Sequence, residues 1–124
     1  FYLGAACHFV QDVTIPQHAN VKLLKNHRSF ENWIIKMYRR FHKFRAYNGG
    51  IYLNSIGKYI ELNSREAIKT YERYSYIENE HIRFYKITSV ILVMAQKTTA
   101  GVMAKFYYDM QRLKAIVMVK LQDN

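Results

Sequence analysis

Residues that break or cross-link a chain are scarce in this sequence of 124 residues. It has one proline and five glycines, a composition typical of a mostly helical protein. The single cysteine, Cys7, excludes an intramolecular disulfide framework and a Cys-x-x-Cys zinc site. No apolar run approaches the roughly 20 residues that a membrane span needs, so we expect no transmembrane segment.

Acidic residues are also few, nine against 19 lysines and arginines, and the formal net charge is +10. This balance attracts anionic partners such as phosphates, nucleic acids and lipid headgroups, but it says nothing about the fold. Half of the residues are apolar, which excludes a disordered chain. The length fits one domain. Because neither methionine nor a basic and apolar leader precedes Phe1, we expect either that processing removed the start or that the chain is a part of a longer protein.

Hydrophobic periodicity and capping residues predict an all-α chain. A first helix covers Phe1 to about Asp12, and Pro16 interrupts the chain after it. A second, amphipathic helix is expected to begin near Asn26 and to end at the pair Gly49-Gly50.

The second half of the sequence predicts two further helices. Asn63 or Ser64 is a candidate cap for a helix that ends near Ile77, and the stretch before it is ambiguous between strand and loop. A long helix then runs from about Glu80 to Met110, with small residues in its middle that suggest close packing or a nearby ligand. In the stretch 113–121 (LKAIVMVKL), clustered β-branched residues predict a short strand.

Histidines and carboxylates are concentrated near the start of the sequence. His8 and Asp12 are four residues apart, as are His27 and Glu31, so each pair projects from one face of a helix. His18 follows Pro16 in the segment between them. One such pair is more often a surface ion pair than a metal site. Two pairs and a proline-positioned histidine within 24 residues make metal binding a serious hypothesis.

The segment 8–20 (HFVQDVTIPQHAN), followed by His27 and Glu31, resembles the bacterial zinc-dependent phospholipase C family. This family includes the clostridial alpha-toxins and the phosphatidylcholine-hydrolysing enzyme of bacilli. The similarity lies in a His-x3-Asp pair, a Pro-x-His with an asparagine after it, and a His-x3-Glu pair. The later stretch from Ala95 to Gly101 is similar to the last long helix of the family.

The resemblance implies a helical bundle with three clustered zinc ions, truncated here at its N-terminal half. By matching position, Asp12 would bridge two metals, His8 would ligate one of them, and the third would be held by three residues. Those three are His18, His27 and Glu31. The remaining ligands and the general base belong to the half that this sequence lacks, so at most one zinc site is expected to be well formed. Residues 1–112 would be a partial catalytic domain, and 113–124 the start of a C-terminal β-sandwich or a tail.

The function implied is that of a secreted enzyme acting at a phospholipid membrane surface. Metal-activated water would hydrolyse phosphatidylcholine-type lipids to diacylglycerol and a phosphorylated headgroup, and the chain alone is expected to be inactive. No nucleic-acid partner is expected.

Two alternatives stay open. A zinc-dependent single-strand nuclease of the same scaffold suits the basic charge. In that family, however, the last ligand pair is His-x3-Asp, whereas this chain has His27-x3-Glu31. A basic helical module that binds membranes without catalysis would use one cationic patch. The patch consists of Lys36, Arg39, Arg40, Lys43 and Arg45.

Overall fold

The structure is a computed structural model that describes residues 2–20 and 27–122. Its helices are α1 (Tyr2–Asp12), α2 (Pro16–Ala19), α3 (His27–Met37), the 3-10 helix η2 (His42–Phe44), α4 (Ile56–Tyr74) and α5 (Glu80–Gln122). No strand occurs within these ranges. The prediction of an all-α chain is therefore confirmed, whereas the phospholipase C type of bundle stays a prediction.

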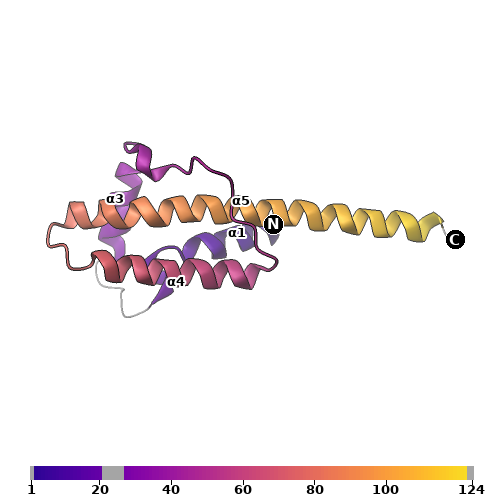
Figure 1. Ribbon diagram of the computed structural model, residues 1–124, viewed down its shortest axis with the longest axis horizontal. Coiled ribbons are helices and arrows are strands. Elements are labelled where there is room, and N and C mark those ends of the chain that lie inside the picture. The colour runs from indigo at the N-terminus through magenta and orange to yellow at the C-terminus, as the bar shows by residue number, and fades with distance from the viewer. Residues whose placement is uncertain (1, 21–26, 123–124) are drawn as a thin grey trace.

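The bundle is built around α5, against which α1, α3 and α4 all pack (Figure 1). One core cluster joins α3, η2 and the first half of α5, and it includes Phe30, Trp33 and Phe84. A second, smaller cluster joins α1, α4 and the middle of α5 through Val10, Tyr59 and Val102. Through these two clusters, α1 and α3 both pack on α5 and keep a defined position relative to each other.

The helix α5 is 43 residues long, and its second half projects past the rest of the molecule (Figure 1). The strand expected over 113–121 is wrong, because these residues continue α5 as a helix. No glycine or proline separates them from Met110, and no neighbouring strand is present in the described chain to pair with β-branched side chains.

The same helix bears on the expected absence of a membrane segment. The part Glu80–Val119 is long and apolar enough to cross a membrane, with a mean hydropathy of 1.3 in its most apolar window. The core helix of a soluble protein passes the same test, and 33% of that window is buried within the bundle. One helix therefore has the length and hydropathy of a membrane span, and the expected absence of a transmembrane segment stays a prediction.

The second predicted helix ends much earlier than its glycine pair. Its start near Asn26 falls outside the described residues, and α3 ends at Met37. The chain then turns, so that Phe44 in η2 becomes buried against Trp33 and Tyr85. In a continuous helix Phe44 would lie on the same face but about 16 Å along the axis from Trp33, whereas the turn brings the two rings together. Burial of the Phe44 ring outweighs the local helical pattern.

The helix α4 begins seven residues or more before its predicted cap. Ser55 caps it, since the Ser55 hydroxyl accepts a hydrogen bond from the Lys58 amide at 3.3 Å. Asn63, expected to be a cap, lies buried inside α4 instead. Its amide donates to the Val10 carbonyl at 2.7 Å and to the Thr98 hydroxyl at 3.0 Å. The prediction of the boundary is wrong because this amide finds tertiary partners.

The segment before α4 crosses α5 at close range. The Ile51 amide donates to the Lys97 carbonyl at 3.0 Å, and the Leu53 amide donates to the Tyr59 hydroxyl at 2.8 Å. A side chain on Gly101 would overlap the Ile51 carbonyl. The small residues of α5 thus serve close packing here.

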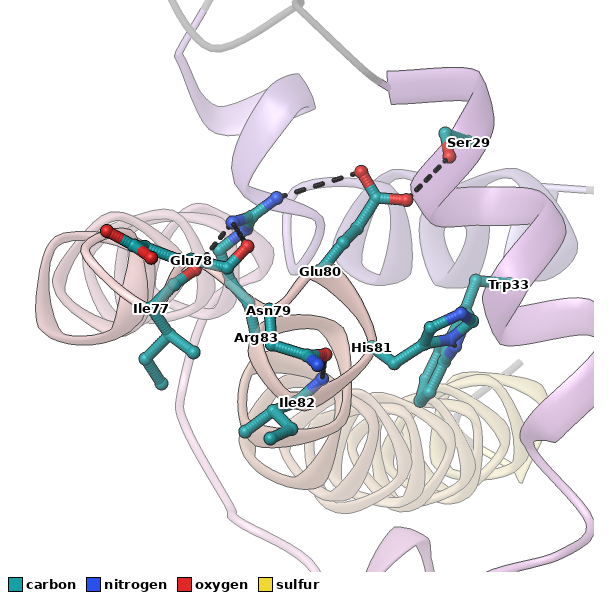
Figure 2. A network of polar contacts seen from close by, with 9 residues as sticks. All are labelled: Ser29, Trp33, Ile77, Glu78, Asn79, Glu80, His81, Ile82 and Arg83. Atoms are coloured by element: carbon teal, nitrogen blue, oxygen red, sulfur yellow. Dashed lines mark hydrogen bonds and ion pairs between the residues drawn. The ribbon is translucent and has the colours of Figure 1, made fainter.

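Polar contacts join α3 to the start of α5, as Figure 2 shows. The Trp33 indole donates to Nδ1 of His81 at 2.9 Å, and Ser29 lies 3.4 Å from the Glu80 carboxylate. Asn79 caps α5 by accepting from the Ile82 amide at 3.1 Å. These contacts orient α3, which contains His27 and Glu31.

We predict that Gly101→Ala lowers the free energy of unfolding by about 1–3 kcal/mol, because the added methyl group must displace the Ile51 backbone. Gly57→Ala is the control. A Cβ there meets open space, and alanine in a helix is favoured over glycine by up to about 1 kcal/mol. Urea unfolding followed by Trp33 fluorescence measures both. Equal stability of the two variants would contradict the close approach.

Candidate metal centre

Three of the five predicted metal ligands converge in the structure. Nε2 of His18 lies 2.6 Å from Nε2 of His27 and 3.7 Å from Oε1 of Glu31. The His27 and Glu31 atoms are 3.0 Å apart. All three ligand atoms lie within 4.8 Å of one another, an arrangement that can hold a metal ion.

Local sequence places each of these side chains. Ile15 is extended, and Pro16 is in the first turn of α2, a position suited to a residue without an amide hydrogen. This single turn presents His18 at its end, and Asn20 closes it through its amide on the Pro16 carbonyl. His27 and Glu31 are one turn apart at the start of α3, so they share a face.

Asp12 lies behind His18. Its Oδ1 is 2.6 Å from Nδ1 of His18, a short contact that is not aligned as a hydrogen bond. Metal-binding histidines usually have a carboxylate or carbonyl at their second nitrogen, which orients the ring. Asp12 occupies this place, and its role as a bridging ligand stays a prediction. The spacing alone did not indicate the contact, because it depends on the turn between α1 and α2.

His8 is not part of the cluster. It is exposed on α1, where its ring is 6.2 Å from that of Phe9, and no metal-binding group in the described chain includes it. The spacing to Asp12 is helical as predicted, but Asp12 turns toward His18. The assignment of His8 as a ligand stays a prediction.

The donor set of the three converging groups suits a metal ion such as zinc. Tetrahedral zinc with bonds of about 2.0–2.1 Å separates its ligand atoms by about 3.3 Å. The distances from Glu31 to the two histidines, 3.0 and 3.7 Å, bracket this value, whereas the 2.6 Å between the histidine nitrogens is a hydrogen-bond distance that must lengthen when both bind one ion. Two histidines and one glutamate also form a common catalytic zinc set with an open fourth position. The side chains of His18 and Glu31 are 22% and 37% exposed, so solvent reaches the cluster.

Three other residues of types that can bind metals or react, His81, Asn20 and Cys7, have structural roles. His81 accepts from Trp33, and Asn20 caps α2. Burial raises the pKa of the Cys7 thiol, which packs beside the cluster of Val10, and this disfavours the thiolate that a nucleophile requires.

The cationic residues expected on one helix face do not share one helix. Because α3 ends at Met37, the patch extends over the following turn, η2 and Arg45. All five of its side chains are exposed, and Arg39 lies over the ring of Tyr38 at 5.2 Å. The patch is a solvated surface and not the polar face of an amphipathic helix.

No family model matches the sequence, and no curated protein or solved structure matches it either. The phospholipase C resemblance thus rests on the motifs alone.

We predict that the chain binds one zinc ion and that His27→Ala weakens this binding more than about 100-fold, since even residues that only orient a ligand are worth 10–100-fold. His8→Ala should leave the affinity unchanged because His8 lies outside the cluster. Competition with a chromophoric chelator measures both variants. Zinc binding that survives His27→Ala would show that the three side chains form only a hydrogen-bonded group.

Asp12→Asn should weaken zinc binding about 10–100-fold while keeping one ion per chain, because the amide keeps the shape but not the charge behind His18. The same titration gives stoichiometry and affinity separately. A loss of stoichiometry would identify Asp12 as a direct ligand instead.

Proposed function

We propose that this chain contributes a zinc centre of His18, His27 and Glu31 to a phosphodiester hydrolase of the zinc-dependent phospholipase C kind. The observation that supports the proposal most is the convergence of three ligand atoms from α2 and α3. These residues are the ones that the family resemblance selects. The resemblance assigns the general base and further metal ligands to residues that this sequence does not contain.

A zinc ion in such a site lowers the pKa of bound water to about 7 and polarises a phosphoryl oxygen. The residues of the chain hold and orient that centre. His18 and His27 present their Nε2 atoms, and Glu31 presents Oε1. Asp12, at Nδ1 of His18, restricts the imidazole ring. The partial exposure of the cluster leaves a side open to substrate.

Phospholipid is the substrate that the chemistry of this surface favours. A net charge of +10 suits any phosphodiester, and so does not distinguish lipid from nucleic acid. Large apolar side chains are exposed on the surface of the bundle, including Phe9 on α1 and Ile35 on α3. They favour contact with a lipid surface. Secretion and the preference for phosphatidylcholine are part of the same proposal.

We predict that the purified chain hydrolyses neither phosphatidylcholine vesicles nor single-stranded DNA, even when zinc is bound, because the expected general base and the remaining metal ligands are not in this sequence. The complete reading frame should hydrolyse phosphatidylcholine and lose this activity with Glu31→Ala or EDTA. Release of phosphorylated headgroup measures the reaction, and His42→Ala is the control because His42 is exposed and remote in sequence from the cluster.

Three results would overturn the proposal in different ways. Faster cleavage of single-stranded DNA would favour the nuclease, and activity that persists in Glu31→Ala would remove the metal centre from the reaction. Vesicle binding that depends on the cationic patch, without hydrolysis by the complete protein, would favour the membrane-binding module.

A further inference from the structure

One face of α5 carries a repeat of the kind that pairs helices, with two polar residues in it, Gln96 and Thr99, whose side chains are bonded within the chain. Its positions alternate in steps of four and three residues, which is the seven-residue repeat of a helix seam. The first half of this seam contains Leu92, Gln96, Thr99 and Met103, and the second half contains Phe106, Met110, Leu113 and Val117.

The first half of the seam is the floor of a groove. The cavity has a volume of about 510 Å³, and its walls include Ile15 after α1 and Ile34 on α3. Ala95 and Ala100 also line it, and such small side chains allow the backbone of another helix to approach closely. The groove is therefore shaped for an apolar ridge.

The second half of the seam is such a ridge. It lies on residues 105–119 of α5, which we call the tail; these residues are exposed from Phe106 onward, and the end of the helix projects past the bundle (Figure 1). Leu113 is 55% exposed and Val117 is 54% exposed. A folded monomer rarely leaves so long an apolar stripe in water.

We propose that two copies of this chain pair through α5 in antiparallel orientation, with the tail of each copy in the groove of the other. A two-fold axis between Ala104 and Lys105 brings ridge and groove into register. It places Phe106 against Met103 of the partner subunit and Met110 against Thr99 of the partner subunit. The same axis places Leu113 against Gln96 and Val117 against Leu92, so every seam position meets a seam position.

The arrangement of charge agrees with this pairing. The positions that flank the seam over its length contain only two charged residues, Asp109 and Lys114, so no two like charges meet across the axis. The opposite face of the tail holds Lys105 and Arg112, and Lys105 is paired with Asp109 at 2.6 Å. These groups stay in water in the dimer, whereas a membrane span would bury them.

The concave shape of the groove favours a helix over a lipid bilayer as its occupant. A bilayer can cover the projecting tail, but it cannot enter the space between α1 and α3. Only a helical ridge fills the groove and covers the tail in one association, and the tail of a second copy is that ridge. The pairing involves none of the predicted metal ligands, and it stands or fails independently of the proposed function.

The oligomeric state of the full chain tests the pairing. We expect sedimentation equilibrium to give a concentration-dependent dimer, and Leu113→Glu to weaken it at least about tenfold because it puts a charge into the seam. Val119→Glu is the matched control. Val119 is 58% exposed, nearly the same as Leu113, but it lies on the face of Lys105 and Arg112, away from the seam, so its dimer should persist. Circular dichroism confirms that both variants remain helical.

Cysteine cross-linking tests the register. In a Cys7→Ala background, a chain with both Thr99→Cys and Met110→Cys should form disulfide-linked dimers, because these positions meet only between antiparallel copies. Within one helix they are about 16 Å apart, too far for a disulfide. Met110→Cys alone should give no cross-link.

Efficient cross-linking of the single Met110→Cys variant would show parallel pairing and overturn the proposal. A monomer at all concentrations, a polydisperse aggregate, or a monomer that binds phospholipid vesicles through the tail would overturn it as well. Equal effects of Leu113→Glu and Val119→Glu would show that the seam is not the contact.

Discussion

The amide of Asn63 is the contact on which the arrangement of the bundle depends. It is 1% exposed and joins three helices, since Nδ2 on α4 donates both to the Val10 carbonyl on α1 and to the Thr98 hydroxyl on α5. A buried amide is costly unless it is bonded, so these partners restrict how the helices can pack. Asp12 ends α1 two residues after Val10, and the position of the candidate centre follows from this bond.

Local sequence patterns predicted a helix correctly where the tertiary packing of that segment favours the same conformation. The first helix was predicted from its lack of helix-breaking residues and the start of α5 near Glu80 from its apolar stripe, and both agree with the structure. Prediction failed where tertiary burial decides the boundary. Phe44 turns back to the core after Met37, and Asn63 is used for packing inside α4 although an asparagine is also a good cap. Neither outcome can be read from neighbouring residues, because each depends on a distant partner.

The candidate centre was more predictable than the helix boundaries. His27 and Glu31 need only one turn of helix to meet, and Pro16 determines the short turn that presents His18. The contact between Asp12 and His18 crosses a turn whose geometry no spacing rule describes. For His8, sequence spacing placed it correctly on α1, but the direction of Asp12 in the fold separates the two side chains.

The two halves of the candidate centre belong to different pairs of helices. His18 is on α2, which packs on α4, and His27 is on α3, which packs on α5. A metal ion coordinated by both histidines would therefore cross-link the two pairs of helices. The single cysteine of the chain cannot form an intramolecular disulfide that would do the same. Coordination energy would then contribute to the folding energy of this end of the bundle, and a metal ion bound there would also cross-link it.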